Sequence, residues 1–144
     1  IVKAVGVSCH NWEALVEAVD NPWCDVILAR LNPFQSHMDG TVEAVNELLG
    51  KARKKGKGLI GMKIFGEGKH VSDAERERSI RFAVTESNLH CMTLGLESIA
   101  QMNDAIERVM DSCLIPPPCV SCADTDNQLL TRKNNQFGTW HCQP

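Results

Sequence analysis

The chain has 144 residues and a net charge of −3, with 43% hydrophobic and 23% charged residues. This balance is typical of a globular domain with a real core, and it gives no electrostatic case for a nucleic-acid partner. No apolar run approaches the roughly 20 residues that a membrane-spanning helix needs, so we expect no membrane partner. Ile1 opens directly into an apolar run without a signal sequence. We therefore expect a cytoplasmic protein that is a processed product or a piece of a longer chain.

Four apolar segments alternate with four amphipathic ones, which predicts four consecutive β-strand–α-helix units. The expected strands are residues 2–7, residues 25–31, the first part of residues 58–68, and residues 90–94. The expected helices lie between Asn11 and Asn21, over residues 41–54, over residues 73–87, and after Ser98. The last of these carries an apolar stripe of Ile99, Met102, Ile106 and Val109. Units in this order predict an α/β fold with a parallel sheet and right-handed crossovers.

Two closures of such a sheet are possible: an open doubly wound sheet, or part of a (β/α)8 TIM-type barrel. A complete barrel takes about 200 residues or more, so four units amount to a half-barrel. The periodic pattern stops after Met110, where a proline run and several cysteines begin. The sequence thus predicts an α/β unit over residues 1–110 and an irregular Cys- and Pro-containing tail over residues 111–144.

Residues 58–68, with the sequence GLIGMKIFGEG, are the stretch around which function is expected. An apolar strand leads to Lys63 and then to the glycine pair Gly66 and Gly68. A capping box from Ser72 to Glu75 follows, so a helix begins there. Strand, glycine turn and helix N-terminus can cradle a phosphate, but they are also the ordinary connection of any α/β protein.

Ligands of parallel sheets bind at the C-terminal ends of the strands. Those ends carry Ser8, His10, Arg30, Lys63, Gly66, Gly68, Gly95 and Ser98. His10, Arg30 and Lys63 could converge on an anion such as a pyrophosphate. Alternatively, Arg30 lies on an outer face and pairs with a helix glutamate. No Ser/His/Asp set is recognisable from order and spacing, and we assign no catalytic residue.

Seven cysteines fall into two groups. Cys9, Cys24 and Cys91 lie in or beside apolar runs and are expected to be small buried hydrophobes. The others are Cys113, Cys119, Cys122 and Cys142. Four thiolates could hold zinc or an iron–sulfur cluster, but the spacing fits neither a zinc ribbon nor a compact ferredoxin run, so unligated thiols are favoured and no metal ligand is assigned.

Four segments in register resemble strands five to eight of the aldo/keto reductase superfamily, in its bacterial predicted-oxidoreductase branch. They are VKAVGVSCHN (residues 2–11), ILARLNP (27–33), LIGMKIFGEG (59–68) and TLGLESIAQMNDAI (93–106). The resemblance implies the C-terminal half of the reductase barrel. It also implies NADP or NAD as cofactor and a small carbonyl compound as the substrate of the parent family.

The resemblance also implies roles for individual residues. Ser8 matches the serine that holds the nicotinamide carboxamide, and Met62 stands where an aromatic residue stacks on that ring. Lys63, Gly66 and Gly68 match the pyrophosphate stretch. Gly95 stands where a lysine often meets the 2′-phosphate, and Gln101 where an arginine lies on the adenosine side. Cys9 and Leu28 depart from the family's asparagine and glutamine.

The catalytic Asp, Tyr, Lys and His of that family lie on its first four strands, and this chain contains no tyrosine at all. The resemblance therefore implies a cofactor-binding portion that is inactive by itself. We expect self-association or pairing with the missing half-barrel, because a half-barrel leaves edges and an apolar face uncovered. Two alternatives stay open: a non-catalytic nucleotide-binding or interaction module, and a metal or redox site in the tail.

Overall fold

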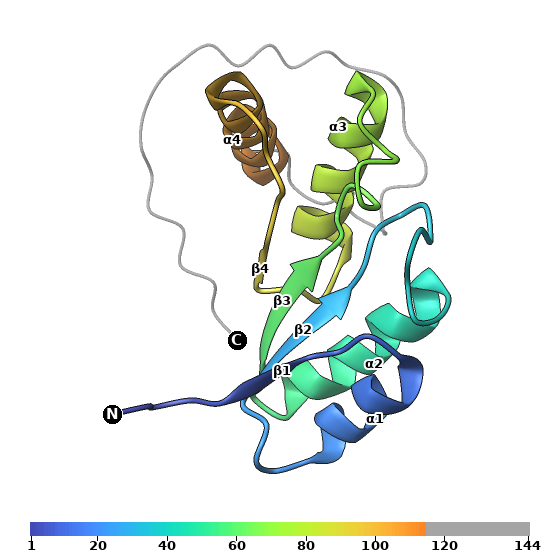
Figure 1. Ribbon diagram of the computed structural model, residues 1–144, viewed down its shortest axis with the longest axis vertical. Coiled ribbons are helices and arrows are strands. Elements are labelled where there is room, and N and C mark those ends of the chain that lie inside the picture. The colour runs from blue at the N-terminus through green and yellow to red at the C-terminus, as the bar shows by residue number, and fades with distance from the viewer. Residues whose placement is uncertain (115–144) are drawn as a thin grey trace, which may run out of the picture.

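The computed structural model describes residues 1–114 and shows an α/β fold with a four-stranded parallel sheet (Figure 1). The strands are β1 (Gly6–Ser8), β2 (Val26–Arg30), β3 (Gly58–Met62) and β4 (Cys91–Met92). The helices are α1 (Trp12–Asp20), α2 (Val42–Lys54), α3 (Asp73–Arg81), the π-helical turn η1 (Phe82–Glu86) and α4 (Ile99–Leu114). The four predicted strand–helix units are confirmed.

The strands lie in the sheet in chain order, β1-β2-β3-β4, and every neighbouring pair is parallel. Each crossover therefore steps in the same direction. A doubly wound sheet reverses direction at a switch point, and the part of the chain that the structure describes contains no such reversal.

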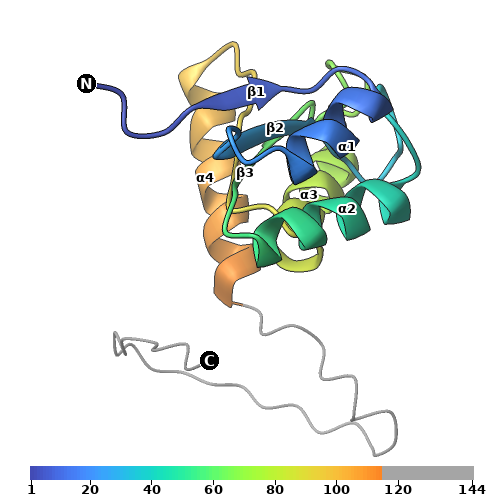
Figure 2. The same cartoon turned by 90° about the horizontal axis from the view of Figure 1, so that it is seen from below.

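One face of the sheet is covered by helices and holds the main core. Ile27, Ala29 and Leu59 point to this face and are fully buried against α1 and α2. Figure 2 shows β1 and β2 above α2 and α3. Because side chains alternate along a strand, the residues between these belong to the opposite face.

That opposite face, called here the open face, has no helix over it among residues 1–114. The strand register places Ser8, Leu28, Ile60 and Cys91 in one row across it. Leu28 and Ile60 are only half-buried, and Cys91 is exposed. Cys9 and Cys24 are buried as expected, but the expectation that Cys91 is buried is wrong, because β4 is an edge strand and Cys91 faces the uncovered side.

Helix α4 joins the structure through α3 and η1. Ala105 and Ser112 are buried, and Arg108 pairs with Glu77 at 3.1 Å and with Asp104 at 2.8 Å. The opposing carboxylates raise the pKa of the Arg108 guanidinium. The side of the helix that faces the protein therefore combines small buried residues with the ion-paired Arg108.

The apolar stripe of α4 is largely exposed. Ile99, Met102 and Ile106 are 74%, 45% and 50% exposed, whereas Val109 packs beside the second core cluster. Arg108 pairs with Asp73 and Glu77 of α3, so this side of the helix, and not the stripe, faces α3.

Other boundaries moved for local reasons. The edge strands β1 and β4 are shorter than predicted, because each pairs with a neighbour on one side only. The helix predicted over residues 73–87 ends in η1, where the Ser87 N–H reaches the Phe82 carbonyl at 3.0 Å. Helix α4 runs to Leu114.

Candidate functional site

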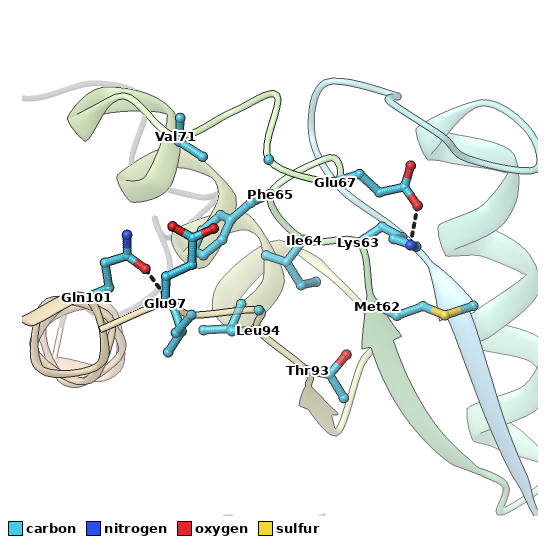
Figure 3. A pocket seen from close by; sticks show the side chains of 13 residues that line it. Met62, Lys63, Ile64, Phe65, Glu67, Val71, Thr93, Leu94, Glu97 and Gln101 are labelled. Atoms are coloured by element: carbon cyan, nitrogen blue, oxygen red, sulfur yellow. Dashed lines mark hydrogen bonds and ion pairs between the residues drawn. The ribbon is translucent and has the colours of Figure 1, made fainter. Parts of the chain in front are cut away.

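A pocket of about 840 Å³ opens at the C-terminal edge of the sheet (Figure 3). Its wall is formed by the end of β3 and the loop after it, the loop after β4, and the first turn of α4. Its lining includes the apolar side chains of Met62, Ile64, Phe65, Leu94 and Leu96. A volume of this size lies within the range of ligand pockets, roughly 300–1,000 Å³.

Lys63 is the cation in the wall of this pocket, and it is already paired. Its ammonium group binds the carboxylate of Glu67, which lowers the pKa of that carboxyl. Glu97 adds a second carboxylate to the wall. An anion that enters the pocket must therefore compete with Glu67 for the ammonium group.

The loop after β3 is folded tightly by its own backbone. Lys63, Gly66, Glu67 and Gly68 all have positive φ angles, of 59°, 57°, 58° and 81°. The N–H of Gly66 donates to the Lys63 carbonyl at 2.8 Å, and that of Gly68 to the Phe65 carbonyl at 3.1 Å. These two amides are thus used within the loop and do not point at a ligand.

The predicted residues around α4 lie on the opposite wall. Gly95 and Gln101 line the pocket, and the Gln101 side chain accepts a 2.8 Å hydrogen bond from the Glu97 N–H. Ser98 caps the helix through the Gln101 N–H at 3.2 Å. The Ile99 and Ala100 N–H groups of this first turn have no acceptor among the described residues.

Ser8, His10 and Arg30 lie beside the pocket and not in its wall. The Ser8 hydroxyl lies 3.0 Å from His10 Nε2 and 3.6 Å from the Met62 sulfur. Ser8 of β1 therefore contacts a residue that lines the pocket but does not line it itself. Arg30 donates to the His10 carbonyl at 2.7 Å. His10, Arg30 and Lys63 thus do not converge on one cavity.

Arg30 is held by Asp39 of the loop after β2, and not by a helix glutamate. The guanidinium contacts both carboxylate oxygens, and Asp39 raises the pKa of Arg30. The Asp39 side chain is 2% exposed. This pair therefore anchors the loop after β2.

A second polar cluster lies on the far side of the Gly66 turn. Ser36 Oγ is 2.6 Å from His70 Nε2, and His70 Nδ1 is 3.0 Å from Glu75 Oε1. We name it the Ser36 cluster. The sequence analysis found no Ser/His/Asp set because these residues lie on separate elements and the acid is a glutamate.

Of the pocket's apolar wall, the sequence analysis singled out Met62. It did not single out the remaining apolar side chains or the two acidic residues, which include Ile64, Phe65, Leu94, Leu96, Glu67 and Glu97. Ile64 and Phe65 follow Lys63 directly, so their proximity to the predicted cradle was the available signal. Glu97 directly precedes the predicted Ser98, so the same signal was available for it.

No three His, Cys, Asp or Glu side chains within residues 1–114 are grouped as metal ligands. Cys113 lies in the last turn of α4 and is exposed. The other three, Cys119, Cys122 and Cys142, lie outside the described residues. No helix in the described range has the length and apolar character needed to cross a membrane.

We compared the chain with known proteins. No protein-family model matches it, and neither a curated protein nor a solved structure matches it. A functional assignment therefore rests on the chain's own residues and geometry.

Proposed function

We propose that this chain is the cofactor-binding portion of an NAD(P)-dependent, aldo/keto reductase-like oxidoreductase that acts on carbonyl substrates. In this proposal its four strand–helix units form a half-barrel, and it binds the nicotinamide dinucleotide without supplying the catalytic Asp, Tyr, Lys and His. The residue resemblance first suggests this function.

The observation that carries the proposal is the position of the pocket. It lies at the C-terminal edge of a parallel sheet in chain order, between the loops after β3 and β4 and the start of α4. In (β/α)8 enzymes the loops after the last two strands and a helix N-terminus frequently hold a phosphate group. β3 and β4 are the strands that resemble those two.

The side chains suggest a direction for the dinucleotide. Met62 touches Ser8 on one side and lines the pocket on the other, so these two residues suit the nicotinamide end. Lys63 in mid-pocket suits the pyrophosphate, with Gly66 and Gly68 shaping the turn beside it. Gly95, Ser98 and Gln101 suit the adenosine side.

When bound, the dinucleotide supplies the hydride. The residues of this chain bind and orient it, and the apolar wall excludes water from the nicotinamide end. The chain has no tyrosine, so the proton donor of the parent family comes from elsewhere. We propose that the open face and the unpaired edges of β1 and β4 adjoin a complementary half-barrel or a second copy.

A thermal-melt titration of the chain with NADPH and, in parallel, NADH tests this function. We expect the melting temperature to rise with dinucleotide concentration. A cooperative melt that neither dinucleotide shifts would overturn the proposal.

Two variants sharpen this test at Lys63. Lys63→Met removes the ammonium group and should weaken binding about tenfold or more, the value of a charge-assisted hydrogen bond. Glu67→Gln releases Lys63 from its carboxylate and should tighten binding. Lys51→Met, on the exposed side of α2, is the matched control and should bind as the original chain does.

The open face also favours a second candidate, a non-catalytic nucleotide-binding or interaction module. The two candidates differ in what the pocket holds: hydride-active NAD(P)H, or a nucleotide without nicotinamide. A melt that ADP shifts as much as NADPH would favour the second. The metal or redox alternative and the domain division at Met110 stay predictions, as does a cytoplasmic location.

A further inference from the structure

The Ser36 cluster joins Ser36 to His70 and Glu75, which lie 34 residues or more further along the chain. Ser36 comes from the loop after β2, His70 from the loop after β3, and Glu75 from the first turn of α3. The serine hydroxyl is 2.6 Å from one ring nitrogen of His70, and the carboxylate is 3.0 Å from the other. Nucleophile, base and orienting acid are thus in hydrogen-bond contact, as a serine hydrolase requires.

The carboxylate decides where the ring carries its proton. Hydrogen bonds from Ser72 and His70 lower the pKa of Glu75 to about 2, so at neutral pH it is a carboxylate that only accepts hydrogen bonds. His70 Nδ1 must therefore hold the N–H that points at Glu75. In the neutral imidazole Nε2 is then unprotonated and accepts the hydrogen bond from the Ser36 hydroxyl.

Packing on both sides fixes the plane of the imidazole ring. The Phe34 ring stacks on it, with centroids 4.1 Å apart and an interplanar angle of 23°. On the Gly66 side there is no room for a side chain, because a Cβ on Gly66 would lie 2.6 Å from His70 Cδ2. His70 therefore cannot turn away from Ser36 without moving its neighbours.

The backbone around Ser36 is also fixed. The buried amide of Asn32 accepts a hydrogen bond from the Ser36 N–H at 3.1 Å and donates one to the Ser36 carbonyl at 2.8 Å. Gln35 and His37, on either side, have φ angles of 57° and 53°. Strained backbone of this kind persists where the surrounding structure imposes it, often at reactive groups.

We propose that the Ser36 cluster is a second active centre, which hydrolyses small activated carboxylic esters through an acyl-serine intermediate. Its three side chains are not among those that line the dinucleotide pocket. Ser36 is half-buried, and the adjoining residue Phe34 is 37% exposed, which offers a short acyl group an apolar contact. The His37 N–H, next after the nucleophile, has no acceptor among residues 1–114 and can stabilise the developing oxyanion.

The reaction balances with water as the only co-reactant. Ser36 Oγ attacks the ester carbonyl carbon while its proton passes to His70 Nε2. The carbon–oxygen bond to the alcohol breaks, and the alcohol leaves with that proton. Water then attacks the acyl-serine, gives a proton to His70, and releases the carboxylic acid as the proton returns to Ser36.

The direct test is covalent labelling of the full chain with a fluorophosphonate probe, after its thiols have been blocked with N-ethylmaleimide. We expect the intact mass to rise by one probe group and peptide mapping to place it on Ser36. Labelling at other serines, or no labelling of protein that melts cooperatively, would overturn the proposal.

Turnover of p-nitrophenyl acetate gives the second readout. Ser36→Ala and His70→Gln should each lower kcat at least a hundredfold. Ser87→Ala, whose hydroxyl donates to a backbone carbonyl, is the matched control and should retain the full rate. Equal rates in Ser36→Ala and the original chain would overturn the proposal.

Glu75 acts through His70 and is a positioning residue. Glu75→Gln should lower kcat at least tenfold and leave KM unchanged, because an amide also stabilises the wrong tautomer. Glu75→Asp should restore part of kcat. A Glu75→Gln variant with unchanged kcat would contradict this role.

Discussion

The two edges of the sheet use polar side chains in different ways. At the N-terminal edge, side chains bind backbone groups: Lys57 donates to two carbonyls, Asp25 accepts from the Val5 N–H, and His90 accepts from the Leu59 N–H. At the C-terminal edge, Arg30 and Asn32 also bind carbonyls. In addition, side chains there bind one another in the Arg30–Asp39 and Lys63–Glu67 pairs and in the Ser36 cluster. The polar side chains named at the N-terminal edge thus bind the backbone near the strand ends, and those at the C-terminal edge include the residues of the two proposed sites.

Backbone strain follows the same division. All four non-glycine residues with positive φ in the described chain lie in loops at the C-terminal edge: Gln35, His37, Lys63 and Glu67. At the N-terminal edge the positive-φ position is a glycine, Gly56. Strain of about 1–3 kcal/mol per site is typical of functional sites. Under the two proposals, we therefore expect substitutions at the N-terminal edge to change stability, and those at the C-terminal edge to change binding or labelling.

The largest effect should come from Lys57→Met at the N-terminal edge. Lys57 is 8% exposed, and its ammonium group donates to the Asn21 carbonyl at 2.7 Å and to the Cys24 carbonyl at 2.6 Å. Losing the ammonium group removes both hydrogen bonds and leaves the Cys24 carbonyl without a partner among residues 1–114, whereas the Asn21 carbonyl keeps the bond from the Cys24 N–H at 3.2 Å. The free energy of unfolding should fall by about 3 kcal/mol. Urea denaturation measures this loss. If the folded variant binds the dinucleotide more weakly, or if the fluorophosphonate probe labels its Ser36 less, the two edges do not differ in the way described.

The next effect separates space from backbone strain at the C-terminal edge. Gly66→Ala places a Cβ against His70 and should cost about 2 kcal/mol and abolish labelling of Ser36. Gly68→Ala is the matched control, since it has a φ of 81° but nothing within 4 Å of its Cβ. It should cost about 1 kcal/mol and leave labelling intact. Equal labelling of both variants would show that Gly66 does not hold His70 in place.

A pair of glycine exchanges tests where strain is tolerated. Gly56→Ala should cost about 1 kcal/mol, because φ is 79° and the Cβ meets nothing within 4 Å. Gln35→Gly should gain about 0.5 kcal/mol, the relief of left-handed strain less the entropy of an added glycine. Paired urea midpoints measure both changes. If Gln35→Gly instead lowers the free energy of unfolding, contacts of the glutamine side chain stabilise the fold by more than the left-handed backbone destabilises it.

The sequence predicted the four units because the apolar periods of strands and helices are local signals. Ser72 and Glu75 show the predicted capping box, in which Glu75 accepts from the Ser72 N–H at 3.2 Å. The orientation of α4 could not be predicted, because it depends on where Asp73, Glu77 and Arg108 meet in space. The pairing of Lys63 with Glu67 depends on two positive-φ residues that no pattern indicates. The Ser36 cluster, in turn, depends on two loops that fold against each other.

The smallest effect concerns acid stability and tests the carboxylate of the Ser36 cluster directly. The pKa of Glu75 falls from its ordinary value of 4.5 to about 2, chiefly through the hydrogen bond from Ser72 and then that from His70. A depressed pKa stabilises the folded chain fully above pH 4.5, and this contribution is lost as the pH falls toward 2.

The difference in urea midpoint between the original chain and Glu75→Gln should therefore be constant above pH 5 and shrink between pH 4.5 and 3. Glu47→Gln, an exposed exchange on α2, is the control and should shift the midpoint little at any pH. A Glu75→Gln difference that stays constant down to pH 3 would mean that the carboxylate is not held by Ser72 and His70. In that case the packing of Phe34 and Gly66 would orient the His70 ring. Glu75 would then not be the group that sets the tautomer of His70, and the proposed ester hydrolysis would lack its orienting acid.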